Sequence, residues 1–251
     1  MQRHAVLLAG FAGLLLTSAL APHSAHADRR TFTRTYEYAT MPAGQTELEL
    51  YSTQSRFRFT DASARSYEFQ LELEHGITDR FDLGIYHVFE QSETDTVSEP
   101  LRFTEIKLRG RYRFAERGEL PMDLLAYLEG VKAFGQGAYK AEAKLIAARD
   151  FDRVLLSTNA IVEVVFGPDA TSELELGWAV GAAYEVSPSL RIGAETYGAF
   201  EAEEPEEVAA YLGPTFSWAT AGKLWIAGTA GFGLNDEANR ISARLILGID
   251  L

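Results

Sequence analysis

The sequence predicts an all-β fold, a transmembrane antiparallel up-and-down β-barrel of about 12 strands. Three observations support this prediction. Apolar and polar residues alternate along many short segments, which is typical of strands with one apolar and one polar face. Residues 1–27 have the composition of an export signal. No later segment contains the roughly 18 consecutive apolar residues of a spanning helix, so this chain can cross a membrane only as a closed barrel.

The N-terminal segment indicates export. It begins with Arg3, continues through an apolar stretch over residues 5–20 and ends in the small-residue cleavage sequence at 25–27. This order is that of a secretory signal peptide; an uncleaved anchor is the alternative. We therefore expect a cleaved signal peptide at 1–27, an N-terminal periplasmic arm at 28–44 and an outer-membrane barrel at 45–251. The sequence leaves open whether the arm is a free tail, a first strand or a segment inside the lumen.

Composition excludes two classes of function. The net charge of −13 would repel phosphates, so we expect no nucleic-acid partner. The chain has no cysteine, which excludes disulfides and thiolate chemistry.

The alternation is clearest in two segments. In 67–75, Leu71 and Leu73 alternate with Glu72 and Glu74, and 105–114 repeats the pattern with basic residues. Turn residues separate further segments of this kind. We expect strands near 45–58, 66–76, 80–90, 101–115, 121–134, 138–149, 153–166, 172–186, 189–201, 207–219, 223–234 and 239–251, with ends uncertain by about three residues.

Aromatic residues indicate the orientation. With an even number of strands, the first strand begins and the last strand ends on the same side of the membrane, which is the periplasmic side. With that orientation, aromatic residues on the apolar parity gather at the two ends of the strands, as the two membrane interfaces require. The periplasmic set is Phe81, Phe114, Tyr184 and Trp218, and the outer set is Tyr67, Phe89, Phe166, Phe200 and Phe232. A soluble β-sandwich with an aromatic core is the competing interpretation.

The polar parity predicts the lumen lining. An Arg or Lys facing lipid near the midplane costs about 2–4 kcal/mol, so we expect the charged faces to point inward. Either they line a narrow pore or they pair and fill the lumen, since small barrels are filled by side chains and large ones leave a channel. The predicted pore-lining residues are Glu68, Gln70, Glu72, Glu74, Lys107, Arg109, Arg111, Arg113, Glu175, Arg191 and Glu195.

The last predicted strand carries an assembly signal. Apolar residues alternate from Ala243 to Leu251, which is similar to the C-terminal strand that the barrel assembly machinery recognises, although that strand usually ends in an aromatic residue. We expect this machinery, outer-membrane lipids and lipopolysaccharide, and small solutes as partners.

Several segments resemble one family of bacterial outer-membrane barrels. They include MPAGQTELELYST at 41–53, HGITDRFDLGIY at 75–86, IKLRGRYRFA at 106–115, ARDFDRVLLSTNAIVE at 148–163, YLGPTFSWA at 211–219 and GFGLND at 231–236. These resemble the family of the MetA pathway of phenol degradation, and the second contains its G-x-T-D-R-x-x-L-G hairpin. The resemblance implies a membrane barrel that acts as a passive channel for small organic molecules, without implying phenol as substrate.

Few residues offer chemistry. The chain after residue 27 has two histidines, His75 and His87, both on the apolar parity. The sequence contains no His-x-Ser pair, and whether a nucleophile lies within the hydrogen-bond distance that a catalytic base needs is left open by the sequence. We expect no catalytic residues, no metal site and no cofactor, with the histidines near lipid headgroups.

Together these observations predict a passive channel or transporter of the cell outer membrane for small solutes, hydrophobic or aromatic ones included. The alternative is a non-conducting structural or surface-binding barrel whose charged lumen is filled. An outer-membrane enzyme is the third hypothesis.

Overall fold

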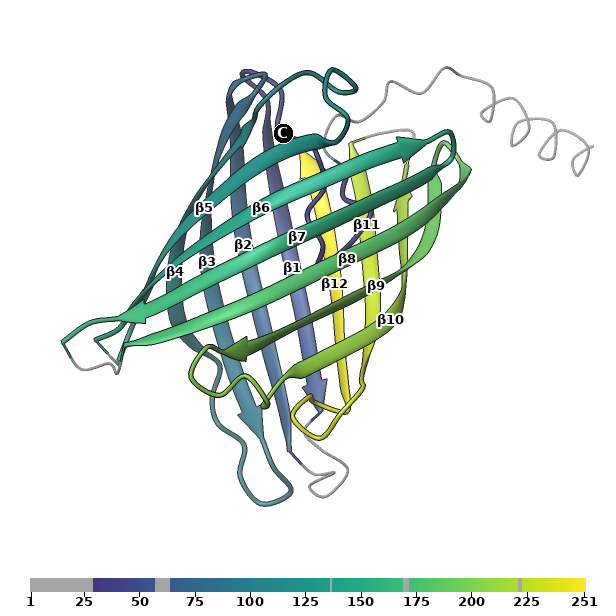
Figure 1. The fold of residues 1–251 in the computed structure, drawn as a ribbon. Coiled ribbons are helices and arrows are strands. Elements are labelled where there is room, and N and C mark those ends of the chain that lie inside the picture. The colour runs from purple at the N-terminus through teal and green to yellow at the C-terminus, as the bar shows by residue number, and fades with distance from the viewer. Residues whose placement is uncertain (1–28, 57–63, 136, 169–171, 221–222) are drawn as a thin grey trace, which may run out of the picture.

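The computed structural model describes residues 29–56, 64–135, 137–168, 172–220 and 223–251, so the predicted signal peptide lies outside the described residues. Twelve strands form one closed antiparallel barrel (Figure 1). They are β1 (Thr46–Arg56), β2 (Arg65–Thr78), β3 (Phe81–Glu93), β4 (Arg102–Arg113), β5 (Asp123–Ala133), β6 (Tyr139–Phe151), β7 (Val154–Phe166), β8 (Glu173–Ser187), β9 (Leu190–Glu201), β10 (Ala209–Ala219), β11 (Leu224–Gly233) and β12 (Ile241–Asp250). In the described part of the chain, no helix has the length and apolar character needed to cross a membrane.

The predicted fold class and strand count are confirmed. The largest difference in strand ends is in β3, which we predicted to end at residue 90 and which continues to Glu93. All sequential strands pair with each other, as the alternating segments and short turns predict.

The barrel closes between the first and last strands. β1 pairs with β12 from Glu47 opposite Asp250 to Arg56 opposite Ile241, and Figure 1 shows purple β1 beside yellow β12. We call the end that contains Thr46 and Asp250 the terminal end. The opposite end, where β1, β3, β5, β7, β9 and β11 finish, is the loop end.

The two faces of the wall have opposite chemistry. Leu71, Leu73 and Leu108 point outward, and Leu108 is 60% exposed. On the same β2 strand Glu72 points inward and is 1% exposed. Such a wall, apolar outside and polar inside, is the reverse of a soluble protein and is the pattern that lipid requires.

Exposed aromatic residues lie near both ends of the wall. Phe114, Tyr184 and Trp218 are exposed at the terminal end, and Phe166 and Phe232 at the loop end. These residues belong to the two predicted sets.

Two connections at the terminal end use residues that tolerate left-handed backbone. Asp152, between β6 and β7, has φ 56°, and Gly118, between β4 and β5, has φ 81°. Asp tolerates this conformation through local hydrogen bonds, and glycine has no Cβ to clash.

Candidate functional site

The segment before β1 enters the lumen. We call residues 29–44 the lumen arm. It starts at the terminal end, where Arg29 donates to the carbonyl oxygen of Pro188 (3.0 Å), and returns there, where the Gly44 N–H donates to the Gly76 carbonyl (2.8 Å). Between these points Phe32, Tyr38 and other arm residues are buried. Of the three arrangements left open by the sequence, the structure shows the segment inside the lumen, not an arm extending into the periplasm.

Glu195 of β9 holds the apex of the arm. Its carboxylate accepts the backbone N–H groups of Thr33 (3.1 Å), Arg34 (3.0 Å) and Thr35 (2.9 Å). It also accepts the hydroxyls of Thr33 and Thr35, each at 3.1 Å, and that of Thr229. Because Glu195 is only 1% exposed, these bonds satisfy a carboxylate and three amides that have little access to water.

Side chains from two other strands hydrogen-bond to the arm backbone, in the place of the backbone bonds that a neighbouring strand would make. Asn159 accepts from the Tyr36 N–H (2.6 Å) and donates to the Tyr36 carbonyl (2.9 Å). Ser157 also donates to that carbonyl (2.6 Å), and Ser217 donates to the carbonyl of Arg30 (2.6 Å). Polar lumen residues thus replace the sheet ladder that the arm lacks.

Two aromatic residues anchor the arm by packing. Phe32 packs against Leu155 and Ala183, and Tyr38 packs in a cluster with Leu125, Tyr127, Ile146 and Ala148. Gly181 makes room for Phe32, since a Cβ at this position would stand 2.7 Å from the phenyl ring.

A buried ion cluster fills the lumen beside β1–β4 near the terminal end. Arg109 lies 2.6 Å from both Glu72 and Glu74 and 3.3 Å from Asp82. Arg111 lies 2.8 Å from Asp82 and also contacts Glu74. Two arginines here face three carboxylates, and every one of these charges contacts an opposite one, which lowers the cost of burying it.

Three carboxylates in this region are spaced closely enough to bind a cation. Glu49, Glu72 and Glu74 each offer an oxygen, and these oxygens lie within 4.8 Å of one another. Arg109 and the Tyr51 hydroxyl, which donates to Glu72 (2.7 Å), already supply hydrogen-bond donors to this group. The expected absence of a metal site stays a prediction.

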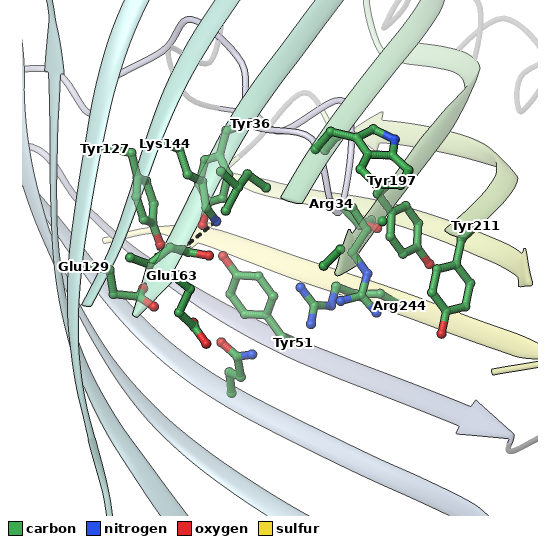
Figure 2. A pocket seen from close by; sticks show the side chains of 18 of the residues that line it. Arg34, Tyr36, Tyr51, Tyr127, Glu129, Lys144, Glu163, Tyr197, Tyr211 and Arg244 are labelled. Carbon is green, nitrogen blue, oxygen red and sulfur yellow. Dashed lines mark hydrogen bonds and ion pairs between the residues drawn. The ribbon is translucent and has the colours of Figure 1, made fainter. Parts of the chain in front are cut away.

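Above the arm the lumen contains open space. A cavity of about 330 Å³ is bordered by the arm and by seven tyrosine and tryptophan rings together with charged residues. A second cavity of about 380 Å³ shares Arg34, Glu68, Tyr197, Tyr211 and Arg244 with it and reaches Gln91, Ser92 and Asn239 at the loop end. We call the two together the vestibule, and Figure 2 shows residues that line its first cavity. Arm residues Arg30, Arg34 and Tyr36 border its first cavity.

The predicted pore-lining residues divide into three groups. Glu68, Gln70 and Lys107 border the vestibule. Glu72, Glu74, Arg109, Arg111 and Glu195 face inward but are buried in the ion cluster or against the arm, so in this structure they do not border the vestibule.

The third group lies near the barrel ends. Arg113 and Arg191 are near the terminal end, where they donate to Thr40 (2.8 Å) and Thr31 (2.9 Å) of the arm. Glu175 is exposed toward the loop end of β8. Whether any of the eleven residues lines a conducting path stays a prediction.

Sequence reasoning missed several residues of the vestibule. The arm arginines Arg30 and Arg34 were not expected in the lumen. The predicted lining also omits five inward tyrosines, because an aromatic side chain does not by itself indicate the polar face; these are Tyr51, Tyr86, Tyr127, Tyr197 and Tyr211.

The two histidines lie on the outward parity. Nδ1 of His75 is 2.8 Å from the Thr46 hydroxyl at the terminal end, and His87 packs on the ring of Phe103 at 5.9 Å. The expected absence of catalysis stays a prediction.

Comparisons with known proteins define the fold. No protein-family model and no curated protein matches the chain. Among solved structures, "KdgM porin in complex with disordered oligogalacturonate" is 11% identical, with a TM-score of 0.51, over 81% of this chain and 97% of that one. The NanC porin is 9% identical, with a TM-score of 0.54, over 81% and 98%. The translocator domain of the autotransporter NalP from Neisseria meningitidis is 7% identical, with a TM-score of 0.51, over 97% and 96%.

At such low identity the likeness concerns the fold. The chain has the fold of outer-membrane β-barrel proteins, and the outer membrane is the location that this fold indicates. The finer resemblance to the MetA-pathway family stays a prediction, because no family model matches.

Proposed function

We propose that this protein is an outer-membrane channel for small solutes and that the lumen arm is its plug. The loop end faces the exterior and the terminal end faces the periplasm. The vestibule inside the closed barrel is the observation that supports this function, because it reaches the loop end and is bordered by the arm. The likeness to porins supports a channel as well.

The chemistry of the vestibule supports polar solutes over purely hydrophobic ones. Charged side chains and tyrosine hydroxyls border it. Tyrosine and tryptophan rings also offer flat surfaces on which a sugar or an aromatic ring can stack. Solutes with a ring and several polar groups therefore suit it best.

A non-conducting barrel is the second candidate. The ion cluster of Arg109 and Arg111 favours it, because these side chains fill one side of the lumen without the arm.

Conductance in a planar lipid bilayer separates the two candidates. The wild-type barrel is compared with a variant that lacks residues 29–40 and keeps the signal peptide. A channel with a plug gives a small or intermittent current that grows when the arm is removed. A folded variant that stays silent would contradict the channel and favour the filled barrel.

A further inference from the structure

The charges around the first cavity of the vestibule are not evenly paired. Five cationic and four carboxylate side chains border it. Three pairs match most of them, and these are Glu68 with Arg244 (3.0 Å), Glu129 with Lys107 (3.8 Å) and Glu142 with Lys144 (2.9 Å). The cations outside these pairs are Arg30 and Arg34 of the arm.

These two arginines have donors to spare. Arg30 is 7% exposed and donates through Nη1 to the Tyr51 hydroxyl (3.0 Å), while its buried Nη2 has no hydrogen-bond partner. Arg34 donates through Nη2 to the Ser242 hydroxyl (2.9 Å), and its buried Nε has no partner. Within the part of the chain that the structure describes, no carboxylate lies within 4.0 Å of either guanidinium to form an ion pair.

A guanidinium that has no carboxylate partner and has a buried N–H without an acceptor favours an anionic ligand, since its planar fork matches a carboxylate. Glu163 faces the same space from the opposite wall (Figure 2). A ligand is therefore attracted on the arm side and repelled on the β7 side, which orients it.

Aromatic surfaces accompany both arginines. The Arg30 guanidinium lies 4.3 Å from the Tyr36 ring centroid, and that of Arg34 lies 5.2 Å from Tyr197. Tyr197 stacks on Tyr211 with centroids 4.9 Å apart and planes at 15°. In Figure 2, Arg34, Tyr197 and Tyr211 share one side of the cavity. A flat ring can pack on these surfaces while its acid group meets a guanidinium.

We propose that the vestibule binds a small organic carboxylate that carries a single ring, with Arg30 and Arg34 as its anion-binding residues. The size is suitable, because about 330 Å³ exceeds the roughly 150 Å³ cavity that holds benzene and leaves room for a carboxylate. Entry from the loop end rests on the proposed function. The ring is that of an aromatic acid or of a sugar acid, and both share the same carboxylate chemistry.

Isothermal titration of the full-length barrel in detergent tests this binding without requiring conductance. Benzoate and glucuronate are the probes, and benzamide is the neutral match for benzoate. We expect at least one acid to bind, and benzamide to bind more weakly than benzoate if benzoate is that acid. The substitutions Arg30→Gln and Arg34→Gln should each lower the affinity for the acid by about tenfold, which is the effect of losing one charge-assisted hydrogen bond.

Arg29→Gln is the matched control, because Arg29 belongs to the same arm but binds the Pro188 carbonyl at the rim. It should leave the affinity unchanged. Arg34→Lys, which keeps the charge and loses the fork, should give an intermediate affinity. Each variant must migrate as a folded barrel in an unboiled gel sample.

The outcomes separate this proposal from the channel. If neither acid binds the folded wild type, or if the Arg29→Gln, Arg30→Gln and Arg34→Gln variants bind equally, the anion site is wrong even where the barrel conducts. Binding that depends on Arg30 and Arg34 in a barrel that never conducts supports the site and contradicts the channel. Glucuronate binding without benzoate binding identifies a sugar acid, and the reverse identifies an aromatic acid.

Discussion

Replacement of Glu195 by glutamine should release the arm from the lumen. Oε1 accepts the Thr33 N–H, and Oε2 accepts those of Arg34 and Thr35. A glutamine keeps only one of these two oxygens. Its N–H₂ group replaces the second oxygen and faces the N–H donors that this oxygen had accepted. At least one buried amide then lacks an acceptor, which costs about 1–3 kcal/mol.

The chain has no cysteine, so one introduced thiol can report arm opening. Ala183→Cys is suitable because Ala183 is buried beneath Phe32. A water-soluble maleimide reaches it only when the arm leaves. If the docked arm is destabilised by about 2 kcal/mol, the labelling rate should rise about 30-fold, since 1.4 kcal/mol corresponds to a factor of ten.

Glu105→Gln is the matched control. Glu105 also lies in the lumen, but it contacts Lys107 (3.6 Å) and Lys140 (3.0 Å) instead of the arm. Labelling should stay at the parent rate. Equal rates in the Glu195→Gln and Glu105→Gln barrels, both folded, would refute the role of Glu195 in holding the arm.

Three further perturbations test the architecture. Gly181→Val should displace Phe32, because even a Cβ would stand 2.7 Å from its ring; the expected result is a larger bilayer current. Arg109→Ala should destabilise the barrel by about 3–5 kcal/mol, because it leaves buried carboxylates without their cation; the temperature at which the folded gel band disappears should fall. Deletion of 247–251 should sharply reduce the amount in the outer-membrane fraction, since it removes pairing to both β1 and β11 and opens an edge that lipid does not tolerate.

Controls for the first two changes come from exposed positions. Gly130 points outward with nothing within 4 Å of an added Cβ, so Gly130→Ala should leave the current unchanged. Arg80→Ala breaks an exposed pair with Glu116, and exposed pairs contribute little to stability. A current that rises equally in both glycine variants, or a stability loss that is equal in both arginine variants, would contradict the assigned contacts. Normal outer-membrane levels of the shortened chain would contradict closure by β12.

The strand positions can be predicted from the sequence because apolar and polar residues alternate along each strand of the wall. Leu71 and Leu73 face lipid and Glu72 and Glu74 face the lumen, and two-residue periodicity shows this without any partner strand. The ion cluster is less accessible from sequence. Asp82 lies opposite Arg111 on the neighbouring strand, but this becomes apparent only once the register is known.

The arm and the vestibule depend on contacts that no local pattern shows. Thr33 meets Glu195 across 162 residues of sequence. The alternation of Thr31, Thr33 and Thr35 suits a strand as well as a segment held by side chains. Its location was therefore undecided until the strands that surround it were in place.

The long separation between the arm and its partners sets an order of events during maturation. The arm precedes all twelve strands in the chain, so its anchors on β7, β9 and β10 are synthesised after it. Non-local contacts of this kind form slowly because a long loop must close first. Both ends of the arm lie at the same rim, so it can fold inward without threading through a closed wall. The wall can therefore close before the arm docks, because docking requires no opening in the wall.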